Sequence, residues 1–177
     1  MKGRNRSPRL LVVDDDPSVA AAYRLILEEP NRAGDSDRTS RLDDLEAELF
    51  GTSEIKEEKH DWRIQFLDQG IDAVSEIRRS LEANDPVTAI FLDVRMPPGI
   101  DGYETARQIR LLDRGVHIVI VTAFSDYSYE DFLLVAGPAD RLNYLPKPIW
   151  PHELRQVAQV LMSEKGYSSL PDHAHVE

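Results

Sequence analysis

Side chains that could carry out chemistry follow several short apolar runs of this sequence. They supply carboxylates, a hydroxyl group and an ammonium group, and they are Asp14, Asp15, Asp16, Asp93, Thr122 and Lys147. Carboxylates held close together repel one another, and a raised pKa or a bound divalent cation relieves the repulsion. Because this set contains neither sulfur nor histidine, the cation would be a hard one, Mg²⁺ or alternatively Mn²⁺. Mg²⁺ typically joins one or two carboxylates to phosphate, so these residues predict phosphoryl chemistry.

Each of these residues also has an ordinary structural interpretation. An isolated Asp at the end of a strand is usually a turn former or a helix cap, and we assign Asp16 to the cap of the helix that follows it. Thr122 and Lys147 taken alone would be a strand-end threonine and a solvated lysine. Their joint placement favours function, because Lys147 could neutralise one phosphoryl oxygen while Thr122 donates a hydrogen bond to another.

The segments that must position these groups alternate between two hydrophobic patterns. Short apolar runs predict buried strands at 9–13, 62–67, 88–92, 116–121 and 141–145. Amphipathic segments predict helices at 18–28, 71–83, 103–112, 129–136 and from Pro151 onward. This alternation is typical of a parallel sheet covered by helices on both faces. In that architecture the functional crevice lies outside the carboxyl ends of the strands, where the charged groups fall.

The spacing of apolar residues predicts which face of three helices points inward. The inward positions are Val19, Tyr23 and Ile26 in the first helix, Val74, Ile77 and Leu81 in the second, and Leu154, Val157, Ala158 and Leu161 in the last.

Composition narrows the function classes. The net charge of −11 and the pI near 4.9 disfavour direct binding to nucleic acid, which relies on Lys and Arg. No apolar run is long enough to cross a membrane, and the run at 10–13 is too short for a secretory signal. The absence of cysteine agrees with a reducing compartment. We therefore expect a cytoplasmic protein.

The chain divides into one domain and three polar segments. We expect tails at 1–8 and 164–177, a domain at 9–163, and an insertion at 31–60 that carries a short amphipathic helix. Leucines at helical spacing within the insertion leave open a role in dimerisation or partner choice, although a solvated surface excursion is the favoured interpretation. His173 and His175 could bind a metal, but a frayed tail is favoured.

Four motifs together resemble the receiver domain of bacterial two-component response regulators. They are LLVVDDDP, FLDVRMPPGIDG, VIVTAFS and YLPKPI, in that order, and the resemblance extends from about Arg9 to Ser163 apart from the insertion. It implies an α/β fold of the flavodoxin-like (CheY-like) type, with a five-stranded parallel sheet in the order 2-1-3-4-5 and helices on both faces. It also implies that the chain accepts a phosphoryl group from a histidine kinase.

The resemblance assigns a role to each matching position. Asp93 matches the phosphoacceptor, Lys147 the essential lysine, and Thr122 the hydroxyl residue that moves onto the phosphoryl group. Tyr144 matches the switch aromatic, and the Lys147–Pro148 bond is commonly cis in relatives. The metal would be held by Asp14, Asp15, Asp93 and the backbone carbonyl of Arg95. The loop MPPGIDG has one residue more than the usual pattern of the family.

These assignments predict a signalling phosphoacceptor that at most catalyses its own phosphoryl uptake and dephosphorylation. Its partner would be a sensor histidine kinase or a histidine phosphotransfer protein, and 129–136, 141–145 and the final helix would form a switching or homodimer surface. One alternative is a receiver-shaped binding module that is never phosphorylated. Another is a phosphate-ester hydrolase of the haloacid-dehalogenase type, because Asp14 and Asp16 have the required spacing.

Overall fold

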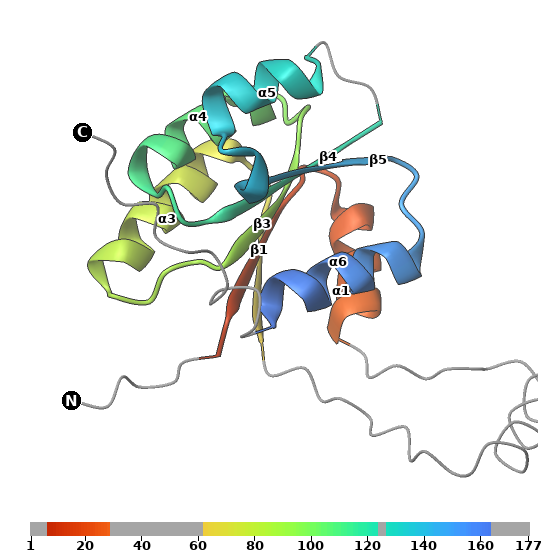
Figure 1. Ribbon diagram of the computed structural model, residues 1–177. Coiled ribbons are helices and arrows are strands. Elements are labelled where there is room, and N and C mark those ends of the chain that lie inside the picture. The colour runs from red at the N-terminus through yellow and green to blue at the C-terminus, as the bar shows by residue number, and fades with distance from the viewer. Residues whose placement is uncertain (1–6, 29–61, 124–126, 164–177) are drawn as a thin grey trace, which may run out of the picture.

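A single parallel sheet runs through the molecule (Figure 1). The structure is a computed structural model, and it describes residues 7–28, 62–123 and 127–163. The strands are β1 (Arg9–Val13), β2 (Arg63–Leu67), β3 (Ala89–Asp93), β4 (His117–Thr122) and β5 (Leu142–Pro146). Their order is β2-β1-β3-β4-β5, which confirms the sheet predicted from the sequence.

Helices cover both faces of this sheet (Figure 1). They are α1 (Pro17–Glu28), α3 (Gly70–Glu82), α4 (Gly102–Leu112), α5 (Tyr129–Ala136) and α6 (Pro151–Met162), with a 3-10 turn, η1 (Ala139–Arg141), before β5. Helices α1 and α6 lie on one face, and α3, α4 and α5 lie on the other. The predicted insertion at 31–60, with the amphipathic helix expected in it, lies outside the described residues, as do the predicted tail at 164–177 and most of that at 1–8.

Alternating side chains of the strands form two apolar layers, as the period of two in a strand requires. Leu11, Val13 and Ile90 point toward α3, α4 and α5. Leu10 and Val12 point toward α1 and α6. The central strand β3 is buried along its whole length, which explains why it consists of an uninterrupted apolar run ending in one carboxylate.

The inward faces of the helices agree with the sequence prediction except at one position. Tyr23 is buried in α1, while Val19 and Ile26 are partly buried. Leu81 was expected to face inward and is 38% exposed, whereas Ser80 is buried in its place. Leu81 lies on nearly the same side of α3 as the buried Val74, because seven residues make almost two full turns, but it is the last residue but one of the helix, so its exposure follows from its place at the helix end.

In the last helix, Leu154, Ala158 and Met162 are buried, and Val157 and Leu161 are partly buried. Within the described residues, no helix is both long enough and apolar enough to cross a membrane.

Candidate functional site

The carboxyl ends of three strands bring two carboxylates and one ammonium group together. Lys147 Nζ lies 2.8 Å from Asp14 Oδ2 and 2.8 Å from Asp93 Oδ1. Asp14 follows β1, Asp93 ends β3, and Lys147 follows β5. Because all strands of a parallel sheet end at the same edge, residues that are far apart in sequence meet here.

Both the side chain and the backbone of Asp93 have close contacts with the loop and helix that follow it. Asp93 is 8% exposed, and its second carboxylate oxygen, Oδ2, accepts a hydrogen bond from the backbone N–H of Arg95 at 2.7 Å. Gly102, the first residue of α4, lies directly against the backbone of Asp93, and its N–H donates to the carbonyl of Val94 at 2.8 Å. A Cβ atom at position 102 would collide with the Asp93 carbonyl oxygen, so only glycine allows α4 to begin this close to the site.

The three acids after β1 have different environments. Asp14 is buried, and its Oδ1 accepts a hydrogen bond from the N–H of Asp16 at 2.9 Å. Asp16 caps α1, because its Oδ1 accepts from Ser18 N at 2.8 Å and from Ser18 Oγ at 2.6 Å, as predicted. These hydrogen bonds from Ser18 lower the pKa of Asp16.

Asp15 is half-buried, and no hydrogen bond or ion pair among the described residues joins it to Asp14 or Asp93. In the part of the chain that the structure describes, no three His, Cys, Asp or Glu side chains are grouped so as to hold a metal ion. Through Lys147, hydrogen bonds therefore join two of the three proposed carboxylate ligands, Asp14 and Asp93.

The charges at this edge shift one another's ionisation. Burial raises the pKa of Asp93, and the nearby carboxylate of Asp14 raises it further, against the opposing hydrogen bond from Lys147. Burial alone would lower the pKa of Lys147, but its hydrogen bonds to Asp14 and Asp93 outweigh burial and raise it. Burial and the two carboxylates also raise the pKa of Tyr23. The site therefore concentrates negative charge around one ammonium group.

Thr122 and Tyr144 lie beside this centre on the last two strands. Thr122 is buried at the end of β4, and its carbonyl accepts a hydrogen bond from the N–H of Lys147 at 2.8 Å. Tyr144 is half-buried on β5, and its ring centroid lies 6.4 Å from that of Phe132 in α5. The Lys147–Pro148 bond is cis, as the resemblance implies.

The loop after Asp93 accommodates its additional residue in a turn. The N–H of Gly99 donates to the carbonyl of Met96 at 3.2 Å, and Met96 is buried beneath the turn. Gln69, which precedes α3, donates from Nε2 to the carbonyl of Pro97 at 3.3 Å. This role of Gln69 could not be predicted, because a polar residue after a strand is compatible with any turn.

Two further residues near the site, Tyr127 and Asp101, were not predicted from the sequence. The hydroxyl group of Tyr127 donates to Asp101 Oδ2 at 3.0 Å, and Asp101 Oδ1 accepts from Glu104 N at 2.8 Å. Asp101 carries a recognisable signal, because Asp is a preferred residue immediately before a helix. Tyr127 carries none, since it lies in a segment without hydrophobic periodicity.

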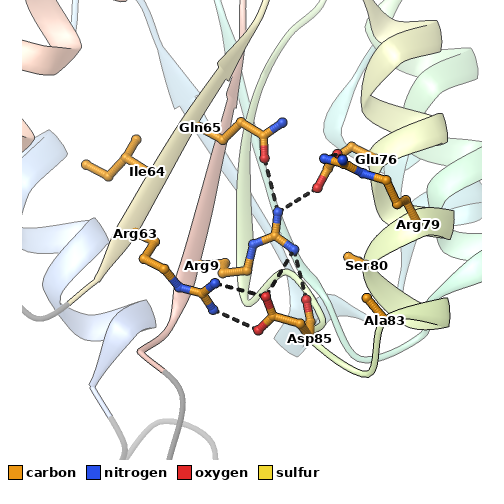
Figure 2. Close-up of a pocket in the computed structure, with 9 residues that line it drawn as sticks. All are labelled: Arg9, Arg63, Ile64, Gln65, Glu76, Arg79, Ser80, Ala83 and Asp85. Atoms are coloured by element: carbon orange, nitrogen blue, oxygen red, sulfur yellow. Dashed lines mark hydrogen bonds and ion pairs between the residues drawn. The ribbon is translucent and has the colours of Figure 1, made fainter.

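A separate hollow of about 460 Å³ lies between β2 and α3 (Figure 2). Its lining includes Arg9 and Arg63, the first residues of β1 and β2, whereas Asp93 is the last residue of β3. Arg9 Nη2 lies 2.6 Å from Glu76 Oε1, and Arg63 Nη2 lies 2.7 Å from Asp85 Oδ1. Arg79 also pairs with Glu76. Each guanidinium group thus has an acidic partner within the hollow. We interpret these ion pairs as structural contacts that join β1, β2 and α3.

Comparison with known proteins places these features in a family. Residues 41–159 match the response regulator receiver domain. This match includes Asp93, Thr122 and Lys147 and begins after Asp14 and Asp15. Response regulator MprA of Mycobacterium bovis (strain BCG / Pasteur 1173P2) is 32% identical over 148 residues, which cover 84% of this chain and 47% of that protein. The chain thus spans about half the length of the curated relatives it matches.

Solved structures share the fold. A CheY-like response regulator receiver domain protein from Methanospirillum hungatei JF-1 is 20% identical with a TM-score of 0.56, covering 88% of this chain and 94% of that one. A CheX-CheY-BeF3-Mg+2 complex from Borrelia burgdorferi contains a chain that is 15% identical with a TM-score of 0.59. The match covers 90% of this chain and 92% of that one. At these identities the likeness concerns the arrangement of strands and helices.

Proposed function

The chain belongs to the response regulator receiver domain family of two-component systems, and from this premise we propose that it accepts a phosphoryl group on Asp93. The observation that carries the proposal is the meeting of Asp14, Asp93 and Lys147 at one edge of the sheet, with Lys147 Nζ 2.8 Å from both carboxylates. A packed core does not require two buried carboxylates around one lysine, since buried charges cost free energy unless they are paired.

The proposed reaction is a nucleophilic displacement on phosphorus. A carboxylate oxygen of Asp93 attacks the phosphorus atom of a phosphohistidine, and a P–O bond forms while the P–N bond breaks. The electron pair of the broken bond stays on the imidazole nitrogen, which takes a proton from water, and Asp93 becomes an acyl phosphate. Lys147 is placed to stabilise the negative charge on the phosphoryl oxygens, because its ammonium group already touches the attacking carboxylate.

A divalent cation belongs to this proposal. Mg²⁺, or Mn²⁺ in its place, would be held by Asp14, Asp15, Asp93 and the carbonyl of Arg95, all of which offer the oxygen atoms that a hard cation prefers. The pairing of Asp14 and Asp93 on one lysine supports this choice, because a cation would relieve the same repulsion. Bound Mg²⁺ would neutralise charge on the phosphoryl group.

We further propose that Thr122 and Tyr144 transmit the reaction to a surface formed by α5, β5 and α6. Both residues lie on strands that neighbour the site, and Tyr144 contacts Phe132 of α5. This surface would contact a second copy or an output partner, and the phosphoryl donor would be a sensor histidine kinase or a histidine phosphotransfer protein. A cytoplasmic location, a lack of direct binding to nucleic acid and a lack of turnover on other substrates remain predictions.

The proposal is tested by treating the chain with acetyl phosphate and Mg²⁺ and measuring the intact mass over time. We expect one phosphoryl group on the wild-type chain and none on Asp93→Asn, with a chelator preventing the reaction. An unmodified wild-type chain would instead indicate a binding module switched by contact alone. Repeated turnover of a generic phosphate ester would indicate a hydrolase, although the hydrogen bonds of Asp16 to Ser18 occupy the acid that such an enzyme would need.

A further inference from the structure

Tyr127 forms a hydrogen bond with the loop that follows Asp93. It lies five positions after Thr122, between the end of β4 and the start of α5. Its hydroxyl group donates a hydrogen bond to Asp101 Oδ2 at 3.0 Å, across 26 residues of sequence. Asp101 lies at the far end of the loop that begins at Asp93, so this hydrogen bond joins the residue two positions before α5 to the loop after Asp93.

Asp101 fixes the start of α4, which in turn lies against Asp93. Its Oδ1 caps α4 by accepting from Glu104 N at 2.8 Å, so its two carboxylate oxygens have different partners. The next residue, Gly102, packs against the carbonyl group of Asp93 so closely that a Cβ atom would not fit. A displacement of Asp101 would therefore reach the backbone of Asp93 through a rigid contact rather than through a flexible side chain.

The ring of Tyr127 belongs to a group of aromatic side chains that ends at Tyr144. It stacks on Tyr103 of α4, with centroids 4.2 Å apart and an interplanar angle of 12°. The ring centroid of Phe132 in α5 lies 5.9 Å from that of Tyr127 and 6.4 Å from that of Tyr144. The position of the Tyr127 ring is therefore set by its contacts with α4 and α5.

We propose that Tyr127 is a positioning residue for phosphoryl transfer, holding the loop after Asp93 through Asp101 so that the Asp93 carboxylate keeps its orientation toward Lys147. The inference rests on the proposed function, because it assigns a role in that same reaction. It adds to that function a residue outside the phosphoacceptor, lysine, hydroxyl and metal-binding positions.

The test compares two variants that each remove one hydroxyl group from the same aromatic stack. Tyr127→Phe removes the hydrogen bond to Asp101 and keeps the ring. Tyr103→Phe is the matched control, because among the described residues the Tyr103 hydroxyl group has no hydrogen-bond partner. The rate of Asp93 phosphorylation at saturating acetyl phosphate and Mg²⁺ is measured by intact mass, and urea unfolding reports stability.

We expect Tyr127→Phe to react about five-fold more slowly at saturating donor, because it loses a hydrogen bond to a charged acceptor. Tyr103→Phe should react at the wild-type rate. Asp101→Asn, which can still cap α4, weakens the same hydrogen bond from the other end, and combining it with Tyr127→Phe should slow the reaction no further than the slower single variant. If Tyr127→Phe folds poorly, the rate of Asp101→Asn alone tests the same hydrogen bond from its acceptor end.

Equal rates for Tyr127→Phe and the wild type, or equal slowing by Tyr127→Phe and Tyr103→Phe, would overturn the positioning role and leave the proposed function intact. Additive slowing in the cycle would likewise overturn it. If the wild-type chain takes up no phosphoryl group at all, the proposed function fails and this inference fails with it.

Discussion

Lys147 Nζ lies 2.8 Å from Asp93 Oδ1, although the two residues are 54 positions apart in the sequence. The same nitrogen lies 2.8 Å from Asp14 Oδ2, so one ammonium group is shared by two carboxylates. The carboxylates are nearly buried, and the lysine side chain is 25% exposed. Lys147 therefore has a structural task, the neutralisation of Asp14 and Asp93, in addition to its proposed role in phosphoryl transfer.

Replacing Lys147 by alanine should separate these two tasks. Lys147→Ala leaves two buried carboxylates without their counter-charge, and we expect it to lower the free energy of unfolding by about 2–3 kcal/mol in the absence of metal. Mg²⁺ affinity should be retained, because the oxygen ligands remain. Added Mg²⁺ should consequently restore much of the lost stability while activation by phosphodonor stays weak.

Urea unfolding with and without Mg²⁺ checks this expectation, and Lys147→Arg serves as the control that keeps a positive charge. A variant that loses Mg²⁺ affinity along with its lysine would contradict the assignment of Lys147 to the phosphoryl group rather than to the metal site.

The raised pKa of Asp93 predicts a pH dependence of stability. Burial raises this pKa above its usual 3.8, so between 3.8 and the raised value the folded state binds more protons at Asp93 than the unfolded state does. The contribution of Asp93 to the free energy of unfolding therefore falls as pH rises through that window. Asp93→Asn cannot ionise and should lack this fall, becoming more stable relative to the wild type as pH rises.

Urea unfolding of both proteins over a pH series from about 4 to 7 measures the difference. Asp68→Asn provides a comparison, since Asp68 is an exposed carboxylate after β2 and is not subject to burial. A wild-type chain that gains stability relative to Asp93→Asn across the window would contradict the proposed dominance of burial over the Lys147 hydrogen bond.

The architecture could be predicted from the sequence because each strand is a short apolar run between polar turns. The run at 88–92 predicted β3 correctly, but the strand extends to Asp93, which pairs with Val121 of β4. Strand ends depend on pairing between chain segments, which hydrophobicity alone does not encode. Leu81 was misassigned because its spacing from Val74 and Ile77 fits the buried face of α3, and spacing alone does not show how far along the helix burial extends.

The site could be predicted in part. Asp14, Asp93 and Lys147 follow strands, and a parallel sheet places strand ends together. Asp15 is the residue next to Asp14, and consecutive residues of an extended chain point in different directions, so the sequence could not show that the two carboxylates have different neighbours. The hydrogen bond from Tyr127 to Asp101 depends on the reach of one side chain between two loops, and no local pattern encodes it.

Gly102 should be far more sensitive to substitution than Gly99 in the same loop. A Cβ atom on Gly102 would collide with the carbonyl oxygen of Asp93 and lie 2.7 Å from Val94 Cα, both of which are backbone atoms. A Cβ atom on Gly99 would meet the end of the Gln69 side chain, which can move. We expect Gly102→Ala to lower the free energy of unfolding by about 1–3 kcal/mol and Gly99→Ala to change it by less than about 1 kcal/mol.

Gly102→Ala should also slow phosphorylation of Asp93, since it displaces the residue that reacts. Chemical denaturation and intact-mass kinetics on the same two variants provide both measurements. Similar losses for the two glycines would show that the backbone contact between Gly102 and Asp93 is not the limiting constraint.

Arg110 should be the most important arginine for stability among those described. It is 8% exposed at the end of α4, and its guanidinium group donates to backbone carbonyl groups. The acceptors are the carbonyl oxygens of Asp113, Arg114, Val116, Ala136 and Arg141. These hydrogen bonds join α4 to the turns before β4 and β5. Burial lowers the pKa of the Arg110 guanidinium group because it disfavours the charged form, and it outweighs the opposing carboxylates of Asp113 and Asp140.

We expect Arg110→Lys to lower the free energy of unfolding by about 2–4 kcal/mol, because an ammonium group cannot reach five acceptors in one plane. Arg107→Lys, on the exposed side of the same helix in an ion pair with Glu104, should change it by less than about 1 kcal/mol. Urea unfolding of the two variants makes the comparison. Equal and small effects would mean that water replaces the lost donors at the turns before β4 and β5, and that these turns are stabilised by the apolar core rather than by Arg110.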